Sequence, residues 1–263
     1  CDPQTMAIAL LRGQPIGAID GVLFDKDGTL SNSEPKLIRL AEQRIEVGLK
    51  LWKERGFAPS SNLDPQQLLR QVFGVRDGGL DPAGTLAVAA RQDNLTSMAS
   101  VFCLLGCSWP EAHTIAAHSF DIVDQRAGEA ADVDDLLPEA DVILSQLRRS
   151  GLHLAVISND TTSGIHCFLR GHGLEHLFQA IWSAEDSPRK PDPQAARALC
   201  RQLNLEPARC ALIGDAETDL QMASAAGLGL VLGFNGGWRF TPELPSAEHC
   251  FNRWSDLSVA TSS

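Results

Sequence analysis

Two aspartates near the N-terminus are the residues whose type and spacing most directly suggest chemistry. Asp25 and Asp27 follow an apolar run and flank Lys26. In an extended strand, residues i and i+2 project to the same face. The spacing therefore predicts that both carboxylates meet one ligand, that Lys26 points the other way, and that Gly28 allows a tight turn. A metal ion and a nucleophilic carboxylate fit such a site.

Two simpler interpretations compete for the same residues. Aspartate and glycine are common in turns at strand ends, whatever the function of the protein. A calcium-binding loop is the other alternative, but it needs an acidic ligand at position twelve, where a count from Asp25 reaches Lys36. The calcium interpretation is therefore weak, and the rest of the chain has to decide between a turn and a phosphate site.

The elements that must position these aspartates alternate between strands and helices. Strands that alternate with helices indicate βαβ units and a parallel sheet. We expect the strand that ends at Asp25 to join that sheet. The predicted strands are 16–25, 152–157, 180–183, 210–213 and 228–232, and the predicted helices between them are 139–150, 163–171, 193–203 and 219–226.

A mainly helical insert separates the first strand from the others. Apolar residues recur there at helical spacing, and turn-forming Gly and Pro residues separate the segments. The predicted helices of this insert, residues 33–137, are 37–52, 68–73, 86–90, 95–105 and 112–123. At the other end of the chain, residues 260–263 are expected to form a loose tail.

Ligands of open parallel sheets bind outside the carboxyl ends of the strands. We expect the predicted strand ends to meet there, where Asp25, Asp215 and the main-chain carbonyl of Asp27 can ligate Mg²⁺. Ser158 and nearby backbone N–H groups can hold phosphate oxygens. Lys190 can balance the carboxylates and the charge that develops in phosphoryl transfer.

Several neighbouring residues have more than one interpretation. Asp219 can bind the metal directly, bind it through water, or steady Lys190, and we favour an indirect role. Asn159 either orients the phosphate or the attacking group, or caps the next helix. Asp160 and Asp192 are expected at helix N-termini, which favour aspartate.

Four motifs, in order, resemble those of the haloacid dehalogenase (HAD) superfamily of aspartate-nucleophile phosphatases. They are Phe24-Asp25-Lys26-Asp27-Gly28-Thr29-Leu30, then Val156-Ile157-Ser158-Asn159, then Arg189-Lys190-Pro191-Asp192-Pro193, and Ile213-Gly214-Asp215 with Asp219. The resemblance implies an α/β fold with a Rossmann-like, doubly wound parallel-sheet core, residues 1–32 and 138–263. The insert, residues 33–137, resembles the α-helical cap domain of the phosphoglycolate phosphatase-like subfamily.

The resemblance also implies a function. It is that of an Mg²⁺-dependent phosphatase that hydrolyses a small phosphomonoester through an aspartyl-phosphate. Asp25 would be the nucleophile, Asp27 the acid and base, and Lys190 the third catalytic residue, while the cap closes over the substrate. We expect the pKa of Asp27 to be raised by like charge, with the metal opposing that effect. The remaining expected roles are metal binding by Asp25, Asp27 and Asp215, and phosphate binding by Gly28, Thr29, Ser158, Asn159 and Lys190.

The chain departs from the family pattern at two positions, and alternative functions stay open. Lys26 stands where phosphatases of the family usually carry an apolar residue, and Asn32 replaces an aspartate. A phosphomutase would use the same residues to pass the phosphoryl group to a sugar. A regulatory protein that binds phosphate or a partner without turnover is the non-enzymatic alternative. Trp109 and Trp238 are candidates to border the pocket.

Composition narrows the class of partner. The chain has 33 acidic and 22 basic residues, a formal net charge of −11. Without a basic cluster, we expect no nucleic-acid partner, and without a long apolar run, no membrane span. The seven cysteines are scattered without the paired spacing of metal ligands. We therefore expect them to be reduced thiols, in a cytoplasmic protein. The expected partner is a small phosphorylated metabolite, and the oligomeric state, monomer or dimer, is left open.

Overall fold

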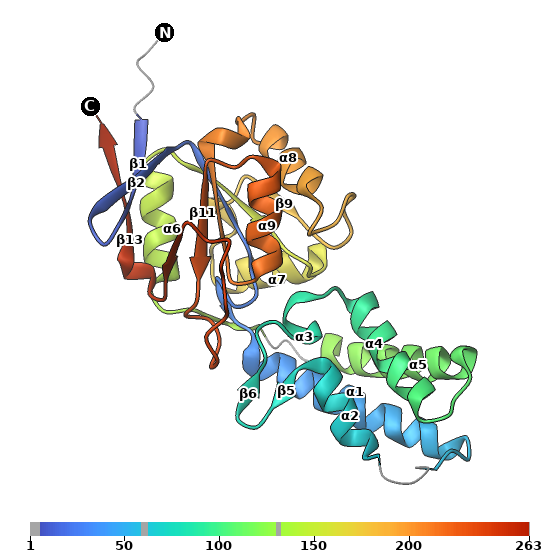
Figure 1. The fold of residues 1–263 in the computed structure, drawn as a ribbon. Helices are drawn as coiled ribbons and strands as arrows, with labels where there is room; N and C mark the ends of the chain where they lie inside the picture. The colour runs from blue at the N-terminus through green and yellow to red at the C-terminus, as the bar shows by residue number, and fades with distance from the viewer. Residues whose placement is uncertain (1–5, 59–62, 130–132, 263) are drawn as a thin grey trace. The chain divides into compact units, whose positions relative to one another are not determined.

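The computed structural model describes residues 6–58, 63–129 and 133–262. The chain forms two compact units, residues 1–33 with 133–263 and residues 34–132 (Figure 1). From the sequence, the boundaries were expected at 32/33 and 137/138. Residues 133–137 lie in the first unit because strand β7 (Asp135–Leu136) pairs with β4 (Ser31–Asn32).

A six-stranded sheet forms the centre of the first unit. All of its paired strands run parallel, in the order β12-β11-β10-β3-β8-β9. This topology confirms the predicted α/β class and places the strand before Asp25 in the middle of the sheet. The strands are β3 (Gly21–Phe24), β8 (His153–Ile157), β9 (Ala180–Trp182), β10 (Cys210–Gly214), β11 (Leu230–Phe234) and β12 (His249–Phe251).

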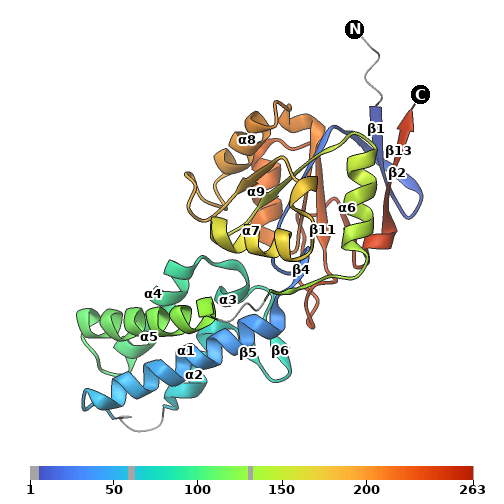
Figure 2. The ribbon, with the colours of Figure 1, turned by 180° about the vertical axis from the view of Figure 1, so that it is seen from behind.

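Helices cover both faces of this sheet, as a doubly wound fold requires (Figures 1 and 2). Val22 and Phe24 pack with α6 (Ala140–Arg149) and α7 (Thr162–Gly171) in one apolar cluster. Leu23, between them in sequence, faces the opposite cluster. That second cluster contains α8 (Pro193–Gln202) and α9 (Glu217–Ala226). Because successive strand residues point to opposite faces, a strand buried on both sides is a continuous apolar run.

The predicted strand 16–25 is wrong as a single element. It divides at Asp20 into β2 (Gln14–Ile19) and β3, which belong to different sheets. At Asp20 the backbone passes from one sheet to the other: its N–H bonds the Arg209 carbonyl at 2.7 Å, its carbonyl accepts the His153 N–H at 2.9 Å, and its carboxylate pairs with Arg209 at 2.6 Å. Both flanking strands bury apolar residues, so the sequence pattern continues across the break.

A second, antiparallel sheet joins the two ends of the described chain. Its order is β13-β1-β2, with β1 (Met6–Leu11) between β2 and β13 (Leu257–Ser262). The expected loose tail at 260–263 is therefore wrong for residues 260–262, since Ala260 pairs with Ile8. Residue 263 lies outside the described residues. The partner strand is almost the whole chain away, so local patterns do not reveal the pairing.

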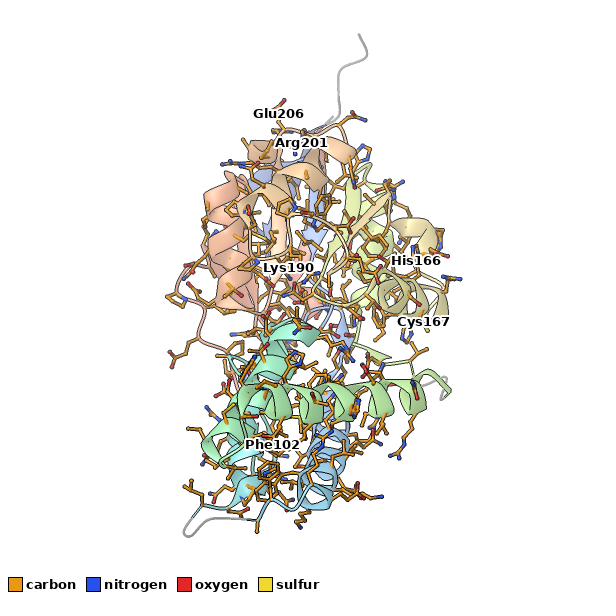
Figure 3. All side chains as sticks on the ribbon, turned by 90° about the vertical axis from the view of Figure 1, so that its right-hand side faces the viewer. Phe102, His166, Cys167, Lys190, Arg201 and Glu206 are labelled. Atoms are coloured by element: carbon orange, nitrogen blue, oxygen red, sulfur yellow. The ribbon has the colours of Figure 1, made fainter. Side chains whose placement is uncertain are left out.

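Helices dominate the second unit, and each predicted helix is present with one or both ends displaced. Trp52, Phe73, Phe102 and Phe120 are among its fully buried side chains (Phe102 is labelled in Figure 3). Most of the helices begin three or four residues before their predicted start, because polar first-turn residues, such as Gln66 and Gln67 behind the Asp64 cap, lie outside the apolar stripe. The elements are α1 (Glu34–Glu54), α2 (Pro65–Phe73), α3 (Thr85–Val88), α4 (Arg91–Leu104) and α5 (Trp109–Glu129), with the hairpin β5 (Val75–Arg76) and β6 (Gly79–Leu80). Throughout the described ranges, every helix is too short or too polar to span a bilayer.

Candidate functional site

The polar residues predicted from the strand ends belong to neighbouring strands of the central sheet. Asp25 directly follows β3, Asp215 follows β10 and Ser158 follows β8, in the order β10-β3-β8. Asp219 lies in the first turn of α9, and Lys190 lies in the loop between β9 and α8. The parallel strands therefore deliver these side chains to one edge, as expected.

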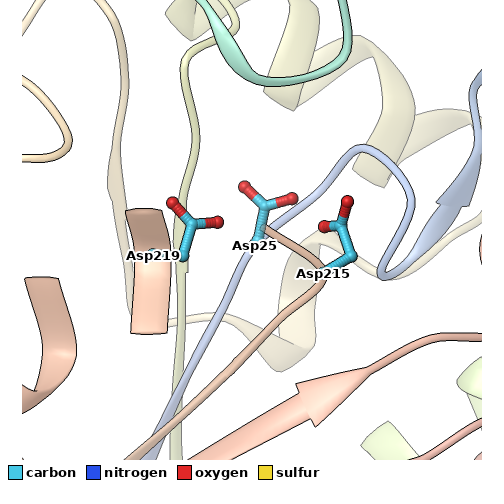
Figure 4. Close-up of side chains that lie close together, drawn as sticks. All are labelled: Asp25, Asp215 and Asp219. Carbon is cyan, nitrogen blue, oxygen red and sulfur yellow. The ribbon is translucent and has the colours of Figure 1, made fainter. Parts of the chain in front are cut away.

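Three buried carboxylates form the centre of the site. Asp25, Asp215 and Asp219 each offer an oxygen, and these oxygens lie within 4.8 Å of one another. Figure 4 shows Asp25 between the other two side chains. The residues are 6%, 2% and 4% exposed, so water screens their mutual repulsion poorly. Such a group of hard oxygen donors suits a divalent cation such as Mg²⁺.

Lys190 supplies positive charge to this group (labelled in Figure 3). Its Nζ donates to Asp25 Oδ1 at 2.6 Å, to Asp219 Oδ2 at 3.0 Å and to the carbonyl of Ile157 at 3.2 Å. All three ammonium protons thus have acceptors. Burial opposes the charged form, but Asp219 and Asp25 outweigh it and raise the pKa of Lys190 above its usual range. The predicted pairing of Lys190 with the carboxylates is therefore present.

One lysine does not neutralise three carboxylates. Burial, followed by the charges of Asp25 and Asp219, holds the pKa of Asp215 well above its ordinary value. Burial also raises the pKa of Asp219 to about 6, although Lys190 opposes the change. Both effects show that another negative charge is unfavourable here. A divalent cation would relieve this repulsion.

Asp215 is held by two neutral donors. Thr29 Oγ1 donates to Asp215 Oδ1 at 2.8 Å, and Trp238 Nε1 donates to Asp215 Oδ2 at 2.6 Å. Thr29 is fully buried and its hydroxyl supports the Asp215 carboxylate, while phosphate binding by Thr29 stays a prediction. The sequence suggested Trp238 only as a pocket border, and no local pattern pointed to its bond with Asp215.

Asp27 has surroundings different from those expected. Its carboxylate lies outside the group of three and accepts from Lys26 Nζ at 2.5 Å, from Ser31 Oγ at 3.3 Å and from Ser33 Oγ. Burial alone would raise the pKa of Asp27, but Lys26 and the two hydroxyls outweigh it and lower the pKa. The expected raised pKa of Asp27 is therefore wrong for this arrangement. Metal binding by Asp27, through its main-chain carbonyl, stays a prediction.

The unusual Lys26 is buried and paired twice. Its Nζ lies 2.5 Å from Asp27 Oδ1 and 3.2 Å from Asp160 Oδ2, and 5.5 Å from the centre of the Phe168 ring. The expectation that it points away from Asp27 is wrong because β3 ends at Phe24, so strand alternation no longer applies. Lys26 therefore holds the Asp27 carboxylate and ties it to the loop before α7.

The loop after β8 carries Ser158 and Asn159, two of the residues predicted to bind phosphate. Ser158 is buried, and its Oγ accepts the Asp160 N–H at 3.1 Å, a contact that does not use the hydroxyl proton. Asn159 lies beside it and is half-buried. Gly28 has a φ of +77°, the left-handed conformation expected for its turn.

The helix caps near the site differ from expectation at one position. Asp192 caps α8 and accepts the Gln194 N–H at 2.8 Å, as predicted. Thr161, and not Asp160, caps α7 and accepts the Gly164 N–H at 3.0 Å. The Asp160 carboxylate accepts the Thr161 N–H at 2.7 Å and pairs with Lys26 at 3.2 Å.

Replacing Lys26 by methionine should lower the free energy of unfolding by roughly 1–3 kcal/mol, because two carboxylates lose a buried partner. The loss stays below that of a fully buried pair since the side chains of Asp27 and Asp160 are 25% and 32% exposed and can be hydrated. Urea unfolding measures the change. Lys50→Met is the matched control: Lys50 is 75% exposed, and we expect a change within about 0.5 kcal/mol. Equal stability of Lys26→Met and wild type would contradict a structural role for the pair.

One protein family and several curated proteins are similar to this chain in sequence. A family model described as haloacid dehalogenase-like hydrolase matches residues 19–227. The phosphoglycolate phosphatase of Cereibacter sphaeroides is 29% identical over 228 residues, which cover 86% of this chain and 90% of that protein. The phosphoglycolate phosphatase of Vibrio cholerae serotype O1 is 27% identical over 220 residues, with 82% and 86% covered.

A solved structure shares the fold. The crystal structure of a predicted phosphoglycolate phosphatase from Haemophilus somnus matches with a TM-score of 0.67 and 23% sequence identity. The match covers 90% of this chain and 96% of that one. At this identity the likeness concerns the fold, and it extends over both compact units of the chain.

Proposed function

The chain belongs to the haloacid dehalogenase-like hydrolase family, and we propose that it is a divalent-metal-dependent phosphatase acting on a small phosphomonoester. The observation that carries the proposal is the position of Asp25. It follows the central strand, pairs with Lys190 at 2.6 Å and shares a buried group with Asp215 and Asp219. The names of the relatives make phosphoglycolate the first substrate to test.

The donor set fits a metal ion of the hard class. Asp25, Asp215 and the main-chain carbonyl of Asp27 would hold Mg²⁺, while Asp219 would act indirectly by steadying Lys190, to which it is bonded at 3.0 Å. When bound, Mg²⁺ would supply positive charge that brings an anionic phosphate close to anionic side chains. The three carboxylates carry more negative charge than Lys190 alone neutralises, which supports the binding of such an ion.

Asp25 would act as the nucleophile. Lys190 engages Oδ1, which leaves Oδ2 as the candidate attacking atom. This oxygen forms a bond to phosphorus while the bond between phosphorus and the ester oxygen breaks. Lys190 stays charged throughout, since its pKa is raised, and it balances the charge that develops on the transferring phosphoryl group.

Asp27 would move the protons. The leaving ester oxygen takes a proton from Asp27, and Asp27 then takes one from the water that attacks the aspartyl-phosphate. That second step releases inorganic phosphate and restores the Asp25 carboxylate. With Lys26, Ser31 and Ser33 around it, Asp27 is an ionised acceptor, so the arrangement favours the second, basic step. Binding of an anionic substrate would favour protonation of Asp27 for the first step.

The phosphate itself would be bound by the turn after β3 and the loop after β8. Ser158 has a hydroxyl proton that its contact with Asp160 does not use. The N-terminus of α7 can add backbone donors, because helix N-termini favour anions, whereas the Gly28 N–H already bonds the Ser31 carbonyl at 3.0 Å. Asn159 is placed next to Ser158 and would orient the phosphate or the attacking water.

A panel of phosphate esters tests the proposal. Purified protein with Mg²⁺ is assayed for inorganic phosphate release from phosphoglycolate, sugar phosphates, a nucleotide and pyrophosphate. We expect a higher kcat/KM for phosphoglycolate than for the other compounds. Release from none of them would sink the proposed activity, whereas preference for another ester would change only the substrate.

Removing divalent metal should lower phosphate release at least about 100-fold, with recovery on adding Mg²⁺. Mg²⁺ should also raise the thermal midpoint in the absence of substrate, because ligands of the native state add RT ln(1 + [L]/Kd), about 2.7 kcal/mol at 100 Kd. A chelator followed by an excess of Mg²⁺ is the control for damage by the chelator. Full activity in the chelator would contradict the metal requirement.

A further inference from the structure

Trp238 contributes to the carboxylate group from outside the segment that the family model matches. That match ends at residue 227, whereas Trp238 lies in the loop after β11. The indole is 7% exposed, and its Nε1 donates to Asp215 Oδ2 at 2.6 Å. Thr29 occupies the other oxygen at 2.8 Å. Two segments that are far apart in sequence thus fix the two oxygens of one carboxylate.

The indole has little freedom to move. A Cβ atom added at Gly28 would overlap the Trp238 ring at Nε1 and the adjoining carbons, so the ring lies directly on the Gly28 turn. A Cβ added at Gly237 would overlap the carbonyl of Gly28. The backbones of the two turns are therefore in contact, and both glycines are needed for that approach. This packing sets where the indole N–H points.

Both donors to Asp215 are electrically neutral. Lys190 already provides one positive charge to Asp25 and Asp219. A second lysine or arginine at Asp215 would cancel the charge that attracts a divalent cation. An indole N–H and a hydroxyl orient the carboxylate by hydrogen bonding and leave its charge in place, and each oxygen keeps a further lone pair.

We propose that Trp238 is a positioning residue for the metal: its indole N–H fixes the rotation of the Asp215 carboxylate so that Asp215 can ligate a divalent cation. The inference rests on the metal-dependent function proposed above. Without the N–H donor, repulsion from Asp25 and Asp219 would turn the Asp215 carboxylate away from them. Loss of the N–H donor should therefore weaken cation binding more than it lowers kcat at saturating metal.

Calorimetric titration of Mg²⁺ into the protein without substrate tests this role. Trp238→Phe keeps an aromatic ring and removes the N–H, and we expect the Kd for Mg²⁺ to rise about 10–100-fold. At saturating Mg²⁺, kcat should stay within about threefold of wild type. Trp238→His, which keeps a ring N–H, should recover part of the affinity. Trp182→Phe is the matched control, since it removes an equally buried indole donor that bonds the Pro188 carbonyl at 2.9 Å, and its Kd should not change.

A spectroscopic measurement on the unaltered protein covers the case in which Trp238→Phe does not fold. The chain has five tryptophans, so at most five indole N–H signals occur in a ¹H–¹⁵N spectrum. Through-space contacts with Gly28 identify the Trp238 signal. We expect Mg²⁺ to shift this signal more than those of Trp182 and Trp254, which donate to main-chain carbonyls.

The outcomes separate the inference from the proposed function. If the wild type binds Mg²⁺ and Trp238→Phe binds it with the same Kd, or if the Trp238 signal does not shift, the positioning role is wrong and the phosphatase proposal stands. If the wild type binds no divalent cation and still releases phosphate, the metal requirement fails, and the role of Trp238 fails with it.

Discussion

Asp25→Asn should reduce kcat for phosphate release by a factor on the order of 10⁴ or more, since loss of a nucleophile removes the covalent step. The amide has almost the same shape as the carboxylate but cannot attack phosphorus. Stability should be kept or rise, because one like charge leaves a buried group in which Asp215 and Asp219 remain. Phosphate release and urea unfolding, measured on the same preparation, give the two results.

Asp141→Asn is the control for this substitution. Asp141 is exposed on α6, and its variant should match the wild type in rate and stability. Acid quenching during turnover should trap a phosphorylated protein in the wild type and in Asp141→Asn, and none in Asp25→Asn. Retention of about a tenth of the wild-type rate by Asp25→Asn would assign the nucleophile to another residue.

Lys190→Met should have the second-largest effect, on stability and rate together. The substitution leaves Asp25 and Asp219 buried without their shared cation, and the carbonyl of Ile157 loses its donor. Breaking a buried pair costs about 3–5 kcal/mol in free energy of unfolding. Loss of a charge near the transferring phosphoryl group should lower kcat by roughly 10²–10³-fold.

Unfolding of Lys190→Met with and without Mg²⁺ tests whether Lys190 and the metal ion stabilise the same carboxylates. A bound cation would replace part of the missing positive charge, so the stability lost in Lys190→Met should be smaller with saturating Mg²⁺ than with a chelator. Thermal unfolding under both conditions measures the difference. Lys53→Met removes an exposed lysine from α1 and should be insensitive to Mg²⁺. An equal loss with and without Mg²⁺ would mean that metal and Lys190 do not share the same carboxylates.

Much of the central sheet could be predicted because its signal is local. The strands β8 and β10 are short apolar runs, and each is followed by polar residues at its carboxyl end. In a parallel sheet that order alone brings Asp25, Asp215 and Ser158 to one edge. Lys190 was expected to pair with carboxylates because the strand ends carry an excess of acidic residues.

Features that depend on distant contacts could not be predicted in the same way. Asp20, where β2 and β3 separate, is in contact with the distant Arg209, and the environment of Asp27 depends on how a buried Lys26 reaches both Asp27 and Asp160. The prediction applied the alternation of strand side chains to residues 25–27, but β3 ends at Phe24. The bond from Trp238 to Asp215 is likewise a tertiary contact without a local pattern.

The pairing of β1 with β13 has a consequence for the order in which the chain folds during synthesis. β1 ends at Leu11 and its partner begins at Leu257. At 5–20 residues per second, β1 leaves the ribosome roughly 12–50 s before β13 does. During that interval β1 and β2 can form only a two-stranded hairpin, which is marginally stable alone. The helical residues 34–132 are complete much earlier, so they can fold first, and the sheet of β1, β2 and β13 closes only after β13 has emerged.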